Sequence, residues 1–306
     1  MNNIVKHILS RSGFYWLIYY FLIPLKRNNL VSDKVFLYFQ YRCICGKRLN
    51  LKSPISFNEK LQWLKLYDRK PHYPEMVDKH EAKKYVAKII GDEYIIPTLG
   101  VWNRFGEIDF DSLPNRFVLK CTHNSGCIVV CKDKSTFDIK KAETIIKVSL
   151  KENFYYSTSE WVYKNLQPRI IAEEYMEDST GELRDYKFFC FDGVPKALFI
   201  ATDRLNKNED TKFDFFDMDF EHLPFRGGHP NANKPIACPL SFEEMKEIAK
   251  ELSKGIPHVR VDLYDVDGKV FFGELTFFHW GGMAPFDPPE WNDIFGSWIN
   301  LPQRQS

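Results

Sequence analysis

The chain has 306 residues, 44% of them hydrophobic and 27% charged, which is typical of a folded, soluble protein and excludes a disordered one. The net charge of +1 gives no indication of a polyanion such as nucleic acid as a partner. Seven cysteines, an odd number with no secretory signal and no Cys-x-x-Cys pair, are interpreted as reduced, buried thiols of a cytoplasmic protein.

The N-terminal region, residues 1–55, is predicted to be helical and basic. Residues 14–25 form an apolar, aromatic run of twelve residues, shorter than the roughly 20 that a transmembrane helix needs. No small-residue cleavage site follows, so a signal peptide is not indicated. Two interpretations stay open. The run is either a buried helix, or an interfacial helix that holds the protein at the inner face of a membrane, with Trp16 and the tyrosines at headgroup level.

Helices and short strands alternate in the first half of the remaining chain. Leu61, Leu64 and Tyr67 are spaced as one face of a helix, and Gly91 is a typical residue for ending the helix that follows. The predicted elements in chain order are helices over 57–70 and 80–91, a strand before 102, a hairpin over 117–132, a helix over 138–152 and a strand over 169–176.

Hairpins dominate the second half. Asp192-Gly193 and Asp267-Gly268 are turn dipeptides, and each lies between two apolar, strand-like runs. The predicted elements are a hairpin over 185–203, a strand over 212–220, a helix from Ser241 to about Lys254 with a capping box at Ser241 and Glu244, and a hairpin over 258–277. This order predicts an α+β fold with mostly antiparallel sheets, not a doubly wound parallel sheet.

The last hairpin carries two acids, Asp262 and Glu274, one on each arm. Same-face residues across an antiparallel ladder lie about 5 Å apart at Cβ. Two carboxylates that close repel each other unless a cation lies between them. Mg²⁺ meets this need with two carboxylates, phosphate oxygens and water, and Arg260 would add a fixed cation beside the phosphates. The alternative is that both acids simply point to water.

Several upstream residues suit a nucleotide, although each signal is weak alone. Lys120 ends a strand before a polar loop whose amides could cradle phosphate, and Lys79 opens a helix. The segment Glu173–Met176 ends a strand where backbone groups could contact adenine, and Asp185 is a candidate for ribose hydroxyls.

The order of these pieces resembles the ATP-grasp superfamily, and in particular its TupA-like branch. The resemblance covers about residues 33–302. It rests on four segments: FNEKLQWLKLYDR, FVLKCTHNSG, DYKFFCFDG and RVDLYDVDGKVFFGELTF. It implies two α+β lobes that clamp a nucleotide, within an ATP-grasp domain over 56–306 whose smaller lobe spans about 115–180.

The resemblance also implies roles for individual residues. Arg260 and Lys120 would be catalytic, and Asp262 and Glu274 would be Mg²⁺ ligands. Thr276 stands where asparagine is common and is the weakest of the three ligands. The implied nucleotide-binding residues are Lys79, Lys120, Asn124, Ser125, Gly126, Glu173, Glu174, Tyr175, Met176, Asp185 and Arg260. The turn Gly281-Gly282-Met283 resembles that of dipeptide-forming ligases and would line the acceptor site.

Together these roles imply an ATP- and Mg²⁺-dependent carboxylate–amine ligase that works through an acyl phosphate. The branch resembles proteins of cell-surface polysaccharide and teichuronopeptide assembly, so a uronic-acid-type carboxylate and an amino acid or amino sugar are the expected substrates. Three alternatives stay open: a phosphotransferase on the same scaffold, a scaffold protein without activity, and a glycosyltransferase. The last would use Asp217-Met-Asp219 or Asp265-Val-Asp267 as a D-x-D motif.

Overall fold

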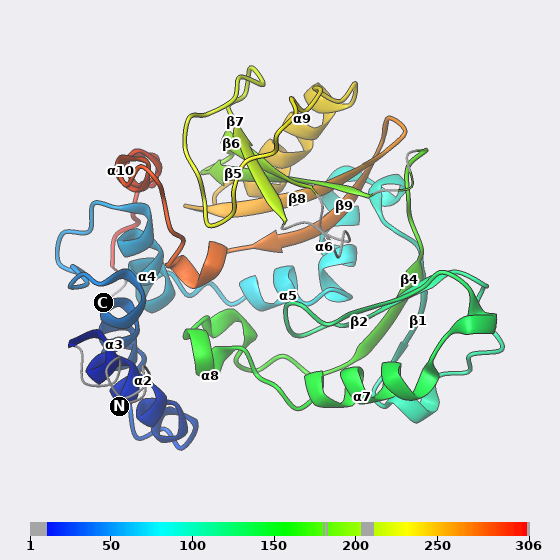
Figure 1. Cartoon of the computed structure of the whole chain (residues 1–306), viewed down its shortest axis with the longest axis horizontal. Coiled ribbons are helices and arrows are strands. Elements are labelled where there is room, and N and C mark those ends of the chain that lie inside the picture. The colour runs from blue at the N-terminus through cyan, green and yellow to red at the C-terminus, as the bar shows by residue number, and fades with distance from the viewer. Residues whose placement is uncertain (1–10, 180, 182, 203–210, 305–306) are drawn as a thin grey trace.

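The computed structural model describes residues 11–179, 181, 183–202 and 211–304. These residues form two antiparallel sheets, each with its own hydrophobic core, and helices pack around them (Figure 1). The predicted α+β architecture with antiparallel sheets is confirmed.

The larger sheet has the strand order β7-β6-β5-β8-β9. Its strands are β5 (Arg184–Phe191), β6 (Val194–Thr202), β7 (Lys212–Phe216), β8 (Val259–Val266) and β9 (Lys269–Thr276). Asp192-Gly193 joins β5 to β6, and Asp267-Gly268 joins β8 to β9. All four turn residues have φ between 50° and 87°, as a tight primed turn requires. Both predicted hairpins are therefore confirmed.

Helix α9 (Phe242–Ser253) covers one face of this sheet and packs against β5, β6 and β8. Ser241 is its N-cap residue, but the Ser241 side chain makes no capping hydrogen bond. The predicted capping box is wrong here, because the Ser241 hydroxyl donates to the Asp265 carboxylate on β8 instead. A capping box does start α4 (Phe57–Tyr67), where Ser56 and Glu59 bond each other's backbone.

The smaller sheet has the order β1-β4-β2-β3. Its strands are β1 (Thr98–Trp102), β2 (Phe117–Cys121), β3 (Ile128–Cys131) and β4 (Ile170–Glu174). The predicted hairpin over 117–132 is confirmed as β2 and β3, and α7 (Ile139–Ser149) packs against β2. The smaller lobe is predicted to span about residues 115–180. Because β1 already belongs to this sheet, the sheet begins before residue 115. The domain boundaries themselves stay predictions.

Two short helices, α5 (Tyr73–Val77) and α6 (Glu81–Ile90), pack against β9. At the other end of the larger sheet, α4 packs against α10 (Glu290–Ser297). All seven cysteines are free, and the prediction of buried thiols is correct for five of them but wrong for Cys45, which is half-buried, and Cys238, which is exposed.

The N-terminal helices α2 (Arg11–Arg27) and α3 (Asp33–Cys45) form a third, small core. On α2, Tyr19 and Leu22 are buried against Phe36 of α3, whereas Tyr20 and Phe21 are 64% and 66% exposed. One side of α2 is thus buried and the other faces outward. Within the described part of the chain, every helix is too short or too polar to cross a membrane.

Candidate active site

The last hairpin carries a row of charged side chains. In its register Arg260 lies opposite Thr276 and Asp262 lies opposite Glu274, so the two acids are cross-strand neighbours as predicted. On the other side of β8, Lys187 of β5 lies opposite Asp262. Three strands of the larger sheet therefore contribute to one row.

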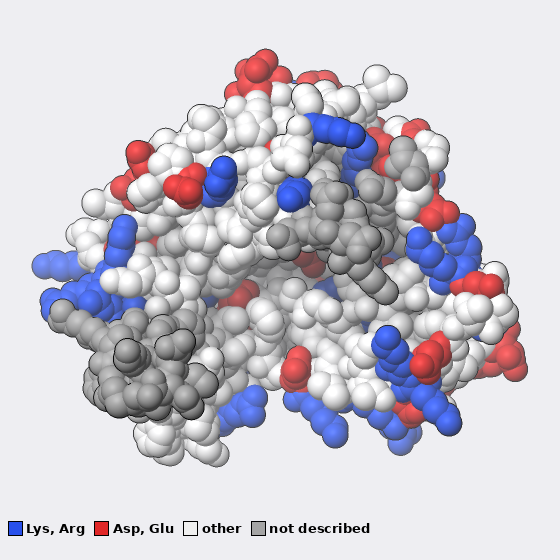
Figure 2. Space-filling view, viewed as in Figure 1, with Lys and Arg blue, Asp and Glu red and all other residues white. Residues whose placement is uncertain are grey.

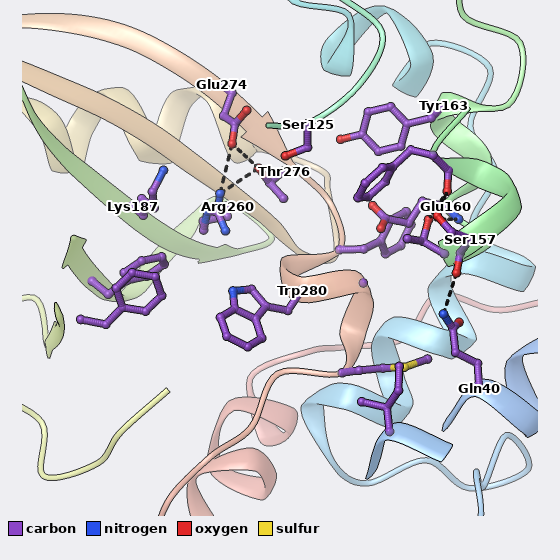
Figure 3. Close-up of a pocket in the computed structure, with 18 of the residues that line it drawn as sticks. Gln40, Ser125, Ser157, Glu160, Tyr163, Lys187, Arg260, Glu274, Thr276 and Trp280 are labelled. Carbon is purple, nitrogen blue, oxygen red and sulfur yellow. Dashed lines mark hydrogen bonds and ion pairs between the residues drawn. The ribbon is translucent and has the colours of Figure 1, made fainter. Parts of the chain in front are cut away.

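Arg260 is the centre of this row. Its Nε lies 2.6 Å from Asp262 Oδ1, and its Nη2 lies 2.7 Å from Asp262 Oδ2. The same Nη2 lies 3.2 Å from Glu274 Oε1 and 3.1 Å from Thr276 Oγ1 (Figure 3). Nη1 lies 2.7 Å from His279 Nδ1, and because a guanidinium can only donate, this nitrogen of His279 accepts. Burial, and then the charge of Arg260, hold the pKa of His279 well below its usual range.

Lys187 lies between two acids, with Nζ 2.6 Å from Asp185 Oδ2 and also paired with Asp262. Asp185 is only 2% exposed, so the structure places it in the charged row. With Glu274 the row contains three carboxylates and two cations. This excess of negative charge in a largely buried setting favours an additional cation.

The donor set of the row fits Mg²⁺, which prefers hard oxygen ligands and often takes only one or two carboxylates. Among the described residues no cluster of three or more His, Cys, Asp or Glu could hold a metal ion by itself, so phosphate and water would complete the shell. Glu274 is accessible, with a side chain 36% exposed. Both carboxylate oxygens of Asp262 already bind Arg260 or Lys187. These two cations would have to move to phosphate oxygens before Asp262 could bind a metal ion.

A second charged cluster lies at β2 and β4. Glu173 on β4 pairs with Lys120 and with Lys83 of α6, each at 2.5 Å. Burial alone would raise the pKa of Glu173, but attraction to Lys120 and Lys83 outweighs it and lowers this pKa to about 2. Lys83 was not predicted, although it lies in the first turn of α6, four residues after the predicted Lys79.

The polar loop between β2 and β3 is anchored at its base. Lys79 Nζ donates to the Asn124 carbonyl oxygen at 2.6 Å, and the buried Asn124 amide donates to Ser149 of α7. Ser125 and Gly126 are exposed at the tip, where Gly126 has a φ of 88°. Of the predicted loop residues, these two are therefore the ones free to contact a ligand.

Two pockets lie along these clusters. The smaller, about 210 Å³, contains Lys120 and the whole predicted segment Glu173–Met176, and Tyr264 of β8 joins them from the larger sheet. Its other walls are apolar side chains: Ile96, Val118, Ile128, Val130 and Leu183. A pocket of this kind suits a flat, largely apolar ring.

The larger pocket, about 550 Å³, contains Ser125 and the row residues Lys187, Arg260, Glu274 and Thr276. The surface is visibly hollowed between the two halves of the molecule (Figure 2). Figure 3 shows Lys187 and Arg260 at one end of this pocket and Glu160 at the other. The predicted acceptor turn contributes Gly281 and Met283, and Trp280 lies beside them. Glu160 was missed because no motif surrounds it.

Comparison with known proteins decides the family. The sequence profile described as TupA-like ATPgrasp matches residues 59–300. The chain belongs to the TupA-like ATP-grasp family. The two antiparallel sheets are therefore those of an ATP-grasp fold, and the predicted resemblance is confirmed.

Solved structures similar to this family member are ATP-grasp ligases. The chain is 13% identical to D-alanine–D-alanine ligase from Bacillus anthracis complexed with ATP, with a TM-score of 0.39, covering 66% of this chain and 54% of that one. For the ATP-grasp ligase PsnB complexed with a phosphomimetic variant of its minimal precursor, Mg and ADP, the identity is 12%, the TM-score 0.41 and the coverage 83% and 64%. The chain thus spans less than two thirds of either ligase. A search of curated proteins found no match.

Proposed function

We propose that the chain is an ATP- and Mg²⁺-dependent carboxylate–amine ligase. The observation that carries this proposal is the arrangement of the two pockets in a member of an ATP-grasp family. Lys120 lines the apolar pocket between the sheets, and Lys187 and Arg260 line the larger, charged one. An adenine ring would occupy the apolar pocket, and the phosphates would extend toward the charged row.

The cationic side chains would exchange partners when ATP binds. Lys120 is held by Glu173, and Lys187 and Arg260 are held by Asp262, so phosphate oxygens would compete with these carboxylates. Glu274 and Asp262, with Thr276 as the weakest member, would hold the metal. Mg²⁺, when bound, neutralises charge on phosphate oxygens.

In the proposed reaction a donor carboxylate oxygen takes the γ-phosphoryl group of ATP, which gives an acyl phosphate and ADP. An amine then attacks the acyl carbon, the bond to phosphate breaks, and an amide and inorganic phosphate form. Lys120 and Arg260 would stabilise the charge that develops on the phosphoryl oxygens. Arg260 is 7% exposed, and a setting from which water is excluded strengthens this stabilisation.

The proposed substrates are a uronic-acid-type carboxylate and an amino acid or amino sugar, in bacterial surface polysaccharide assembly such as capsule, O-antigen or teichuronopeptide. This choice follows the resemblance of the sequence to the TupA-like branch. The larger pocket adds aromatic walls, among them Phe199, Phe213 and Trp280, which suit the apolar face of a sugar ring.

We also propose that α2 contacts the inner surface of a membrane. Leu17, Tyr20 and Phe21 are 58–66% exposed on one side of this helix. Exposed Arg27 at its C-terminus and Lys34 at the start of α3 favour an anionic lipid surface.

The two D-x-D motifs serve turns, which favours the ligase over a glycosyltransferase. Asp217 Oδ1 accepts from the backbone nitrogens of Asp219 and Glu221. Asp265 Oδ1 accepts from the nitrogen of Gly268, and its other oxygen accepts from Ser241. Both motifs therefore have a structural explanation.

The test combines nucleotide choice with product analysis. ATP with MgCl₂ should raise the melting temperature, and UDP-sugars should not. In a screen of uronic acids paired with amino acids or amino sugars, active pairs should release ADP and inorganic phosphate in equal amounts. Release of ADP without inorganic phosphate would indicate a phosphotransferase, and stabilisation by UDP-sugars alone would overturn the proposal.

A further inference from the structure

A buried carboxylate lies in the larger pocket and has no role in the proposed handling of ATP. Glu160 is 3% exposed and lies between α8 (Tyr155–Thr158) and a 3₁₀ turn, η4 (Trp161–Tyr163). It lines the pocket at the end away from Arg260 (Figure 3). Its Oε1 atom is fully buried and has no hydrogen-bond partner. A buried carboxylate oxygen without a partner is costly, and such an atom in a pocket points to a ligand.

The nearest cation does not satisfy this oxygen. Lys65 of α4 is completely buried, but its Nζ donates to the carbonyl oxygens of Thr158 at 2.8 Å and Gly281 at 2.6 Å. These two bonds hold the segment before Glu160 and the Gly281 turn together. Lys65 thus shapes this end of the pocket while Glu160 Oε1 stays available.

Glycine at position 281 keeps space beside the carboxylate. A Cβ atom there would lie 3.6 Å from Glu160 Oε1, in ordinary van der Waals contact, and Gly281 has a φ of 61°, which favours glycine. A longer side chain would therefore compete for the space next to Oε1.

The charges and walls of the pocket select for a cationic group at this end. At the opposite end, the charged row with Lys187, Arg260 and Glu274 would be occupied by phosphate and Mg²⁺, whereas Glu160 would attract an ammonium group at this end. The aromatic residues Phe278 and Trp280 also line the pocket, and aromatic faces stabilise organic ammonium groups. Burial raises the pKa of Glu160, and Lys65 opposes this rise; a ligand's ammonium group would favour the ionised carboxylate further.

We propose that Glu160 binds the ammonium group of the acceptor substrate, so that the larger pocket selects primary amines over uncharged analogues of the same shape. That the bound amine is the acceptor substrate rests on the proposed ligase function. Binding of the amine to Glu160 can be measured without turnover. It names Glu160 as a specificity-determining residue and a primary amine with an apolar or ring-shaped body as the ligand class.

The experiment compares two probes of matched shape, 2-phenylethylammonium and 2-phenylethanol, by ligand-observed NMR titration of the full chain. Wild type should bind the amine at least tenfold more tightly than the alcohol. Glu160→Gln should bring the two affinities together, and Glu143→Gln on α7, outside the pocket, should keep the wild-type preference. Equal binding of both probes by wild type, or an unchanged preference in Glu160→Gln, would overturn the proposal and leave Glu160 as a structural partner of Lys65.

Two further measurements keep the outcomes separate. Melting of each variant with ATP and MgCl₂ reports on the nucleotide site, so failure of ATP to stabilise wild type would count against the ligase and not against the amine site. If Glu160→Gln does not fold, Glu160→Asp retains the charge but moves it back by one methylene group. That variant should bind the amine more weakly than wild type does and still prefer it to the alcohol, and loss of affinity for both probes alike would contradict the proposal.

Discussion

Asp262 and Glu274 lie opposite each other, yet their surroundings differ. Arg260 and Lys187 hold both oxygens of Asp262, while the Glu274 side chain is 36% exposed toward the larger pocket. Glu274 is thus the acid that a metal can reach without displacing a bidentate partner. Of the two proposed carboxylate ligands, it offers the cleaner test.

Glu274→Gln should lower ATP turnover by about 100-fold or more, since it removes one negative ligand from the charge-stabilising centre of the site. Steady-state ADP release with an active substrate pair measures the effect, and added MgCl₂ should restore part of it if metal affinity is the cause. Glu243→Gln on the exposed side of α9 is the matched control and should turn over like wild type. Unchanged turnover in Glu274→Gln would show that the metal assignment is wrong.

Glu173 is expected to matter for stability as well as for ATP. Glu173→Gln leaves Lys83 and Lys120 without their shared counter-ion, with side chains 10% and 15% exposed, and should cost about 3 kcal/mol of unfolding free energy. Because the folded pKa of about 2 is below the ordinary carboxyl value, this stabilisation is complete above roughly pH 4.3 and is lost as the pH falls toward 2.

Urea denaturation of both proteins at several pH values checks this expectation. The gap in unfolding free energy should be largest at neutral pH and should narrow in acid. Glu177→Gln, which removes a partly exposed partner of Arg116, is the control and should change the stability little. A gap that stays constant down to pH 3 would mean that Glu173 is not ionised by its two lysines.

At this scale the sequence was most informative about the hairpin itself, because the Asp267-Gly268 dipeptide marks its turn. The exact pairing of the two acids does not follow from spacing: four residues lie between Asp262 and the turn and five between the turn and Glu274, and a register shift between Asp262 and Leu263 brings them opposite each other. The Lys83–Glu173 pair joins a helix to a strand, and such long-range contacts leave no local pattern. Glu160 could not be predicted for the same reason.

Single elements were predictable when their signals were local. The two Asp-Gly hairpins and the end of α6 at Gly91 follow from backbone preferences of a few residues. Helix α4 is different, because its polar residues Gln62 and Lys65 are as buried as its apolar ones. Only the tertiary contacts of these two side chains with the Gly281 turn explain that burial.

The exposed side of α2 leads to a prediction about lipid. Replacing both Leu17 and Phe21 with Glu should reduce binding to phosphatidylglycerol–phosphatidylcholine vesicles at least tenfold, because each substitution removes apolar area and adds a charge that such a surface repels. Co-sedimentation measures the bound fraction. Val148→Glu on α7, also an exposed apolar residue, is the control. Equal sedimentation of the double variant and wild type, or no binding of wild type, would contradict the proposed membrane contact.

For the whole molecule, the important feature is how strands that are distant in the sequence come together in the two sheets. β4 lies between β1 and β2 although it follows both in the chain, and β8 pairs with β5 across more than sixty residues. Neither pairing follows from periodicity, because strand order in a sheet depends on contacts between distant segments. The resemblance to a family supplied what the pattern of apolar residues could not.

Tyr264 tests whether both sheets bind the nucleotide. It is the residue of the larger sheet that lines the small pocket, opposite the segment Glu173–Met176. Tyr264→Ala should raise the KM for ATP about tenfold, in line with the loss of one aromatic contact to a base, with little change in kcat. Tyr264→Phe keeps the ring and should behave like wild type. A lower kcat with an unchanged KM for ATP would show that the adenine base of ATP does not bind beside Tyr264.

The inner side of α2 has a consequence for any shortened version of the protein. Tyr19 donates to the carbonyl oxygen of Ser157 at 3.2 Å, and Lys26 donates to that of Tyr155 at 3.1 Å. The helix that faces outward with Leu17 and Phe21 therefore also fastens the segment leading to Glu160, and Tyr19 itself lines the larger pocket. A chain cut back to its two sheets would lose part of the wall of the larger pocket, so screens for the proposed substrates need the N-terminal helices in place.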